Sequence, residues 1–499
     1  MTKRSLIAAL AFAGALAACG GEFKAGFSRV DITPPLGSFM PGYYIDRRAK
    51  SVLDPLEINC VAFSDGRERA LVMQFDTESL SDLVADGMRD AIAKATGVKR
   101  DAILLHASHT HDGGFLALKP EGAPVESDDG VPSSDAEIDR LYVAMATTRA
   151  ADAAVMALAD LKGARLSCGR SVARRISFGR RYLMKDGRVL TNPGVKNPDI
   201  VRPVGNPPDE EVQVLRIDRD GAKPIAVINF QTHPDVVGGE TLTADWPGLT
   251  RTVFEAANLG DAHAMVLNGT QGDVNHVNVM PLAGEENGLH KDFDDVDRGY
   301  DHAWHMAKVI SGAALQVWMK CVPLAAGEIR FGSADVSVPA NRAKPTDEKN
   351  VAWADDVWAL HEKSDAEGVA GTAKDYVTKK YGWTGMELTT EVARAGRIRR
   401  LAKGPDRFKL PVYAIALGPD VAFGGFPGES FNDIGKAVKK ASPFKLTLLS
   451  CLTNGSRGYF PFSDSYKEGG YESATSPFGP TVADDLIRGE TALLVRLHK

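Results

Sequence analysis

The chain has 499 residues, of which 44% are hydrophobic and 25% are charged, which is typical of a globular protein with a large core. Its net charge of -6 leaves no basic excess to neutralise phosphates and argues against nucleic-acid binding as the main activity. A small-molecule substrate or a lipid head group stays open as the ligand.

The N-terminus predicts a signal peptide over residues 1–18. Two basic residues precede an apolar run that is too short to cross a bilayer as a permanent helix. The letters LAAC that end at Cys19 resemble a bacterial lipobox, which implies cleavage before this cysteine and its lipidation. We therefore expect an exported bacterial lipoprotein in the outer membrane or periplasm, with a short tether at residues 19–22 and no membrane contact beyond its lipid anchor. A plain signal peptide is the alternative.

Apolar runs that end in polar loops recur along residues 23–499, which we expect to form a single catalytic domain. The runs that predict strands are INCVAF, ALVMQFD, AILLHAS, VQVLRID, IAVINFQ, VAFGG and LTLLS. Helical spacing covers residues 81–96 and 135–161. Together they predict an α/β fold, with a mixed β-sheet flanked by helices and a site in the strand-end loops. A charged, helix-prone insert at about residues 341–409 predicts a lid or a packing element, and no internal repeat is visible.

The cysteines say little about the fold. Those after Cys19 are Cys60, Cys168, Cys321 and Cys451. They are widely spaced and form no Cys-x-x-Cys motif, so neither a zinc ribbon nor a dense disulfide scaffold is indicated. The spacing allows one or two disulfides but does not give their pairing.

The sequence LLHASHTHDGG places three histidines directly behind a predicted strand. On an extended backbone His109 and His111 point to the same face, whereas His106 has the opposite parity and is expected to be structural. Two histidines do not make a zinc site, which needs three or four protein ligands. The neighbouring Asp112 is a candidate to orient an imidazole. A merely polar loop is the alternative reading.

Other strand-end loops supply further donors. His233 and Asp235 lie in NFQTHPD, Glu429 lies in FPGES and Tyr459 lies in GSRGYF. Glu429 can equally be a charge at a helix N-terminus, and Asp245 in TADWPG can be a helix N-cap. No Gly-x-Ser-x-Gly elbow and no nucleotide-binding motif is present, so a metal-activated water is the better mechanism.

The order of these loops resembles the neutral, non-lysosomal ceramidase family. The segments that carry the resemblance are SHTHDG, NFQTHPD, TADWPG, QGDVNHVN, FPGES and GSRGYF followed by GGYESATSPFGP. The resemblance implies a zinc amidohydrolase whose ligands match His109, His233, Glu429 and Tyr459. It places His111 beside the metal as the residue that handles protons.

The resemblance also implies further site residues. Arg175 or Arg181 falls near the family's substrate-side segment and is expected to hold a substrate oxygen, with ordinary surface arginines as the alternative. Tyr471, in the closing motif, is expected to contact substrate. Asp245 is expected to be catalytic because its segment matches a family motif.

Two departures from the family pattern limit what the resemblance implies. Asn275 occupies the position of the family's catalytic serine and is a catalytic candidate by that position, although asparagine cannot act as the nucleophile. His276 stands where the family has proline. The family's C-terminal immunoglobulin-like domain has no counterpart after FGP, so we expect a shorter, divergent member.

The leading hypothesis is an exported zinc hydrolase of a linear amide, in ceramide or another N-acyl amine. The alternatives are an esterase, lactonase or sugar N-deacetylase with the same site, or a surface lipoprotein that binds without catalysis.

Overall fold

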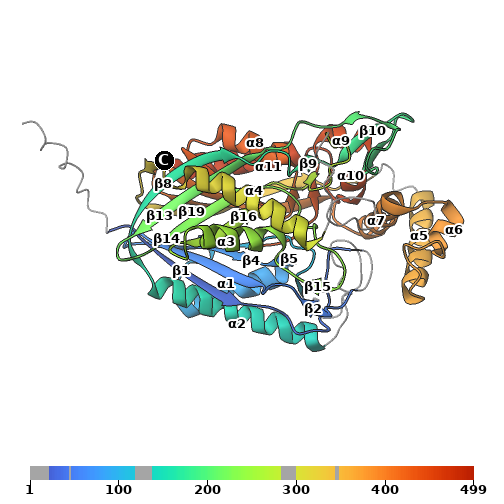
Figure 1. Ribbon diagram of the computed structural model, residues 1–499. Helices are drawn as coiled ribbons and strands as arrows, with labels where there is room; N and C mark the ends of the chain where they lie inside the picture. Colours follow the sequence, from blue (N-terminus) through green and yellow to red (C-terminus); the bar gives the residue numbers. More distant parts are fainter. Residues whose placement is uncertain (1–21, 44–46, 118–136, 283–298, 343–347) are drawn as a thin grey trace, which may run out of the picture.

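The computed structural model describes residues 22–43, 47–117, 137–282, 299–342 and 348–499. The predicted signal peptide and the tether up to residue 21 lie outside the described residues. The predicted fold class is confirmed, because mixed sheets are flanked by helices (Figure 1).

The same arrangement of strands and helices occurs three times along the chain. Each unit has three antiparallel strands, a helix, a fourth strand parallel to the third, and a closing helix. The first unit comprises β1 (Lys24–Asp31), β3 (Glu57–Ser64), β4 (Arg69–Phe75), α1 (Asp82–Thr96), β6 (Ile103–Ala107) and α2 (Glu137–Ala159). The second comprises β8 (Lys162–Val172), β13 (Glu211–Arg219), β14 (Ala222–Phe230), α3 (Asp245–Ala257), β16 (His263–Asn268) and α4 (Tyr300–Trp318). The third comprises β19 (Ile329–Pro339), β20 (Arg407–Leu417), β21 (Val421–Gly425), α8 (Asn432–Ala441), β23 (Leu446–Ser450) and α11 (Val482–His498).

This repetition corrects the expectation that the chain has no internal repeat. The units differ in the connection between their first two strands, which spans 25 residues between β1 and β3 but holds the whole insert between β19 and β20. The connections hold the remaining short elements: β2 (Ser51–Val52), β5 (Thr77–Leu80), η1 (Arg100–Ala102), β7 (Gly114–Leu116), β9 (Phe178–Gly179), β10 (Arg181–Met184), β11 (Val189–Thr191), β12 (Ile200–Pro203), β15 (Thr241–Leu242), β17 (Val274–Asn275), β18 (Val322–Leu324), β22 (Glu429–Ser430), β24 (Tyr459–Phe460), α9 (Ser463–Glu468) and α10 (Tyr471–Thr475). Because the insertions differ in length, the three units do not recur at a constant spacing in the sequence.

The repeated topology places all long loops at one edge. In each unit the third and fourth strands are parallel, so both end at the edge where the first strand also ends. The fourth strands of the three units meet there: the Asn268 amide donates to His106 Nε2 at 2.9 Å, and the Cys451 amide donates to the Asn268 carbonyl at 3.3 Å. Loops from three distant parts of the chain therefore gather at one place.

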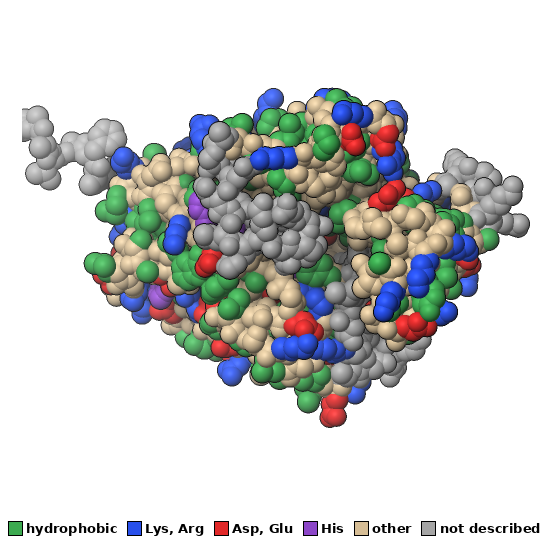
Figure 2. Space-filling view, turned by 45° about the vertical axis from the view of Figure 1, so that its right-hand side comes forward, with side chains coloured by type: hydrophobic (Ala, Val, Ile, Leu, Met, Phe, Trp, Pro, Cys, Tyr) green, Lys and Arg blue, Asp and Glu red, His purple; other side chains and the backbone are tan. Residues whose placement is uncertain are grey.

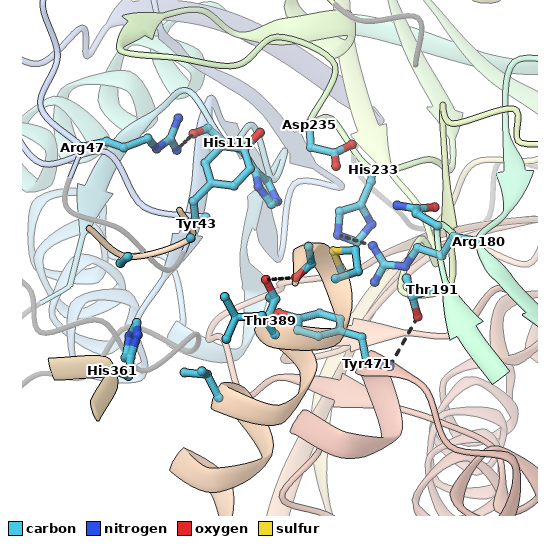
Figure 3. A pocket seen from close by; sticks show the side chains of 18 of the residues that line it. Tyr43, Arg47, His111, Arg180, Thr191, His233, Asp235, His361, Thr389 and Tyr471 are labelled. Atoms are coloured by element: carbon cyan, nitrogen blue, oxygen red, sulfur yellow. Dashed lines mark hydrogen bonds between the residues drawn. The ribbon is translucent and has the colours of Figure 1, made fainter. Parts of the chain in front are cut away.

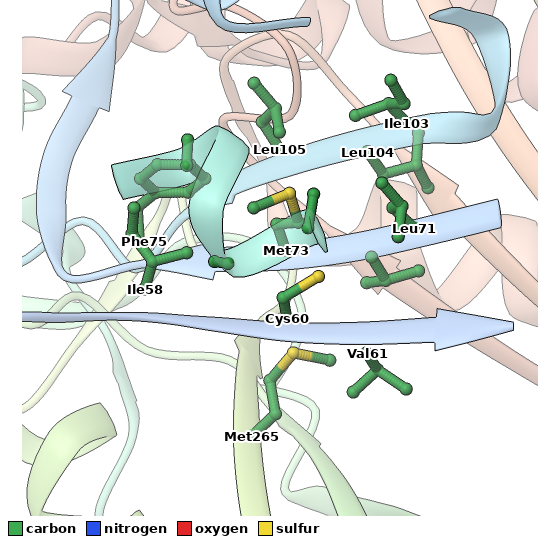
Figure 4. Close-up of a cluster of buried hydrophobic side chains, with 14 of the residues drawn as sticks. Ile58, Cys60, Val61, Leu71, Met73, Phe75, Ile103, Leu104, Leu105 and Met265 are labelled. Carbon is green, nitrogen blue, oxygen red and sulfur yellow. The ribbon is translucent and has the colours of Figure 1, made fainter. Parts of the chain in front are cut away.

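One hydrophobic core joins the units. Side chains of β3, β4 and β6 gather with Met265 of β16 (Figure 4), and Ile415 and Phe423 of the third unit belong to the same cluster. Cys60 is fully buried within it. All four described cysteines are free, so the disulfides that the sequence allowed are not formed in this structure.

Helix α2 is long and apolar enough, by length and composition, to cross a membrane. It instead covers the first unit with a stripe of alanines, of which Ala146, Ala150 and Ala153 are fully buried. Gly26 of β1 allows this close packing, since a Cβ there would lie 2.0 Å from the carbonyl oxygen of Ala157. Helix α2 is thus a core helix of the fold.

Three helices occupy the segment where the sequence predicts an insert: α5 (Glu348–Ala366), α6 (Tyr376–Tyr381) and α7 (Gly385–Ala402). They have a small core of their own around Trp358, Val377 and Val392. The insert projects from one side of the molecule (Figure 1), and α7 packs against α10. The Arg397 guanidinium donates to the Ser473 carbonyl at 3.1 Å and tethers the two helices.

Candidate metal centre and cavity

Donor atoms from all three units converge at the common edge. His109 Nε2 lies 3.2 Å from His233 Nε2, and Glu429 Oε2 lies 3.3 Å and 3.1 Å from these two nitrogens. His111 Nε2 lies 3.3 Å from His109 Nε2. Tetrahedral zinc with bonds of about 2.0–2.1 Å separates its ligand atoms by roughly 3.3–3.4 Å. The spacing of His109, His233 and Glu429 therefore fits one bound metal ion. His111 also belongs to the possible metal site, because the ligand atoms of the three histidines lie within 4.8 Å of one another.

The far side of two imidazoles is fixed by backbone carbonyls. His109 Nδ1 donates to the Glu78 carbonyl at 2.9 Å, and His233 Nδ1 donates to the Gln271 carbonyl at 3.0 Å. With the proton on Nδ1, each Nε2 presents its lone pair to the cluster. This arrangement is typical of histidines that bind a metal.

The electrostatics of the cluster favour a positive charge at its centre. Burial is the largest single effect and lowers the pKa of His109, but the charge and hydrogen bond of Glu429, together with those of Glu78, raise the pKa to about 9. Burial together with the charge of Arg180 lowers the pKa of His233. Burial raises the pKa of the Glu429 carboxyl. The charges and hydrogen bonds of the His109 and His233 imidazoles together outweigh burial and hold this pKa well below the ordinary value. A proton on His109 or a bound cation satisfies this carboxylate.

His111 differs from the other two histidines. Its Nδ1 is buried and has no hydrogen-bond partner among the described residues, so its tautomer is not fixed. Burial and the charge of His109 lower its pKa well below the ordinary value. The Arg47 guanidinium binds the carbonyl of His111 and forms an ion pair with Asp112 at 3.1 Å. Asp112 thus holds Arg47, and Arg47 holds the histidine loop.

Strand pairing places Tyr459 next to Glu429. The two residues are register partners in the parallel pair of β22 and β24. Tyr459 is buried and hydrogen-bonded to Arg180. Arg180 also donates to Glu472 at 2.6 Å and lies 3.3 Å, through Nη1, from His233 Nε2. A guanidinium fixed by a buried carboxylate therefore stands beside the candidate metal centre.

The centre opens into a cavity of about 670 Å³. Residues of the first-to-second-strand connections of all three units line it: Tyr43 and Arg47, then Arg180, Thr191 and Asn192, then His361, Met386, Leu388, Thr389 and Val392. Figure 3 shows His111, His233 and Arg180 across the cavity from His361 and Thr389. On the face shown in Figure 2, side chains of both charge signs are interspersed. Because the lining residues His361, Met386, Leu388, Thr389 and Val392 belong to the predicted insert, the insert forms one wall of the cavity.

No family model and no curated protein matches this chain. Among solved structures, the neutral ceramidase from Pseudomonas aeruginosa has a TM-score of 0.64 to this chain at 14% sequence identity, covering 96% of this chain and 74% of that one. A ceramidase complexed with C2 has a TM-score of 0.66 at 15% identity, covering 95% of this chain and 76% of that one. The chain has the neutral ceramidase fold. The resemblance predicted from six short motifs is confirmed at this level.

Within the ceramidase fold, the predicted substrate-side residues lie in different places. Tyr471 lines the cavity, and its ring lies 5.6 Å from that of Tyr459. Arg175 is exposed, and Arg181 is buried against Ser465 and Glu468; neither lines the cavity. Arg180, which the sequence did not single out, lines it instead. The roles predicted for Arg175 and Arg181 stay predictions.

The predicted catalytic residues Asp245 and Asn275 are both fully buried and do not line the cavity of this ceramidase fold. Asp245 accepts the amides of Val236 and Val237 at 3.0 Å and 3.1 Å and so holds the loop behind His233. Asn275 donates to the Asn192 side chain at 3.2 Å and accepts the Val277 amide. These contacts are structural, and the catalytic roles stay predictions.

His106 provides a test of stability against pH. Its Nδ1 donates to the Cys451 carbonyl at 2.7 Å and its Nε2 accepts the Asn268 amide, so the folded state requires the neutral ring. Burial lowers its pKa to about 4. In the unfolded chain His106 takes up a proton near pH 6.5, whereas in the folded chain it does so only near pH 4. The contribution of the neutral His106 ring to the stability of the folded state is therefore complete above pH 6.5 and is lost as the pH falls toward 4. From pH 7 to 5 we expect His106 to lower the free energy of unfolding by about 2 kcal/mol.

Denaturant titrations of wild type and His106→Gln at both pH values measure this difference. The glutamine variant is expected to lose that part of the pH dependence, whereas His305→Gln, at an exposed histidine of α4, keeps it. An unchanged pH dependence in His106→Gln contradicts the assignment of a buried neutral ring.

Gly42 controls the position of His111. It has a φ of +98°, and a Cβ would lie 2.7 Å from the His111 ring. Gly42→Ala is therefore expected to displace the imidazole and to lower kcat by roughly 10- to 100-fold, because small misplacements of catalytic groups are costly. Gly187→Ala is the matched control: its φ is +86°, no atom lies within 4 Å of the added Cβ, and the residue does not line the cavity. Equal losses of kcat in the two variants would point to backbone strain alone.

Proposed function

We propose that the chain is a zinc-dependent hydrolase of a linear amide bond, with a ceramide-like or other N-acyl amine as substrate. The observation that carries the proposal is the convergence of His109, His233 and Glu429, with both imidazoles fixed from behind by carbonyls. The ceramidases that share the fold support an amide as the bond cleaved. Nitrogen and carboxylate donors suit zinc.

His109, His233 and Glu429 would hold the metal, with Tyr459 beside Glu429 to complete the set. Bound zinc would supply an acidified water and polarise the scissile carbonyl. Arg180, whose Nη1 lies 3.3 Å from His233 Nε2, is the cation that we propose donates a hydrogen bond to the carbonyl oxygen as negative charge develops there.

His111 is the proton carrier of the proposal. Its ring has no hydrogen bond at Nδ1 with the described residues, and we propose that it accepts a proton from the attacking water and delivers the proton to the leaving nitrogen. The water oxygen bonds to the carbonyl carbon, the C–N bond breaks, and the products are a carboxylate and an amine. Because Asn275 has no hydroxyl group, we assign the nucleophile to water rather than to a side chain.

A substrate panel tests the reaction. N-acyl and O-acyl compounds with the same acyl chain are incubated with zinc-loaded protein, and the released acid is measured. Faster release from the amides supports the proposal, and preference for the esters contradicts it. Release from neither, with zinc bound, would favour a binding protein.

We further propose that the protein is exported and anchored through a lipid on Cys19. Labelling of cells with a radioactive fatty acid should mark the wild type and not Cys19→Ser. Equal labelling of both would contradict the lipobox reading.

A further inference from the structure

The insert places one histidine in the wall of the cavity. His361 of α5 is 7% exposed and lines the cavity opposite His111 and His233 (Figure 3). Its ring lies 5.6 Å from that of Trp358. No hydrogen bond to either ring nitrogen is formed by the residues that the structure describes. The ring nitrogens are not among the fully buried polar atoms of the described residues, so they are accessible from the cavity and can bind a ligand group.

The surroundings of His361 select the chemistry of that ligand. The neighbouring wall is largely apolar, with Met386, Leu388 and Val392 from α7. Asp375 is the acidic residue of this wall, but its carboxylate already accepts the Ser364 hydroxyl and the amides of Gly371 and Val377. Asp365, Asp375 and Glu362 carry negative charge near His361, so an anionic ligand group is disfavoured there. A neutral hydroxyl group suits an imidazole in an apolar wall, because each can donate or accept.

We propose that His361 is a specificity-determining residue that hydrogen-bonds a hydroxyl group of the substrate at the insert side of the cavity. The inference rests on the proposed function, since it names a feature of that substrate. The hydroxyl belongs to either the amine half or the acyl half of an N-acyl amine. The apolar residues around His361 pack against the hydrocarbon that carries it.

Kinetics with paired substrates test this assignment. One pair differs by a hydroxyl group in the amine half, and the other by a hydroxyl group in the acyl half. In the pair whose differing hydroxyl group contacts His361, the wild type is expected to favour the hydroxylated member by about 10-fold in kcat/KM, the effect of one neutral hydrogen bond. The other pair should show no such preference. His361→Leu should remove the preference, His361→Gln should retain part of it, and His305→Leu should leave it intact. No preference in wild type, or an unchanged preference in His361→Leu, overturns the proposal.

Binding measurements separate this proposal from the proposed reaction. Trp358, next to His361, provides a fluorescence signal for titration with a long-chain amino alcohol, a long-chain hydroxy acid and the deoxy analogue of each. If the protein hydrolyses no amide, about 10-fold tighter binding of one hydroxylated compound still supports the role of His361. Equal affinity within both pairs, or equal discrimination by His361→Leu, overturns it even if amides are hydrolysed. Circular dichroism checks that each variant is folded.

Discussion

Glu429→Gln is expected to lower amide hydrolysis by about 1,000-fold or more, since metal polarisation contributes several kcal/mol to such reactions. The substitution keeps the shape of the side chain but removes the charge that lies 3.1 Å from His233 and 3.3 Å from His109. Zinc affinity should fall with activity. Initial rates at saturating zinc, together with zinc titration of the stripped protein, measure both effects.

Glu78→Gln is the matched control for this experiment. The Glu78 side chain lies 3.8 Å from His109 Nδ1, but the backbone carbonyl of Glu78 accepts the hydrogen bond from the ring. We therefore expect a loss of about 10-fold or less, at the lower end of the range for groups behind a metal ligand. Similar losses in Glu429→Gln and Glu78→Gln would contradict the assignment of Glu429 as the ligand.

Arg180→Met is expected to lower both stability and activity. Arg180 and Glu472 form a buried ion pair at 2.6 Å, with the Glu472 side chain fully buried. Removal of Arg180 leaves Arg181, at 3.7 Å, as the charge partner of Glu472, so we expect a loss of about 1–3 kcal/mol, below the about 3–5 kcal/mol for a buried charge without a partner. The proposed hydrogen bond from Arg180 to the substrate carbonyl would be lost as well, so we expect a fall in kcat of roughly 100-fold. Urea denaturation and steady-state kinetics measure the two effects separately.

Arg175→Met is the control for that variant. Arg175 is exposed and lies outside the cavity, so its replacement should change stability by less than about 0.5 kcal/mol and leave kcat/KM within about twofold. A large loss of activity in Arg175→Met, with little effect in Arg180→Met, would restore the substrate role that the sequence predicted for Arg175.

Strand-end chemistry made much of the site predictable from sequence. His109, His233 and Glu429 each follow an apolar run, and parallel strands bring such ends to one edge. The physical reason for the convergence of His109 and His111 was nevertheless different from the predicted one. Strand β6 ends at Ala107, and His109 has a left-handed φ of 74°, so the two rings meet through a turn rather than an extended strand.

The remaining features depend on contacts that sequence spacing does not encode. Arg175, Arg180 and Arg181 lie in one short segment, and only the paths of β9 and β10 decide which of them faces the cavity. Arg47 is held by an ion pair with Asp112, which is 65 residues away in the chain, and in turn binds the carbonyl of His111. The threefold repetition is hidden by insertions of unequal length, one of which carries His361.

Zinc titration of stripped protein, followed by hydrolysis of an N-acyl substrate, tests the central claim most directly. The account predicts that removal of the metal abolishes activity and that activity returns in proportion to added zinc, up to about one ion per chain. In His233→Ala the same titration should restore no activity. Full hydrolysis by metal-free protein, or zinc binding that survives His109→Ala and Glu429→Ala unchanged, would contradict a metal centre formed by these residues.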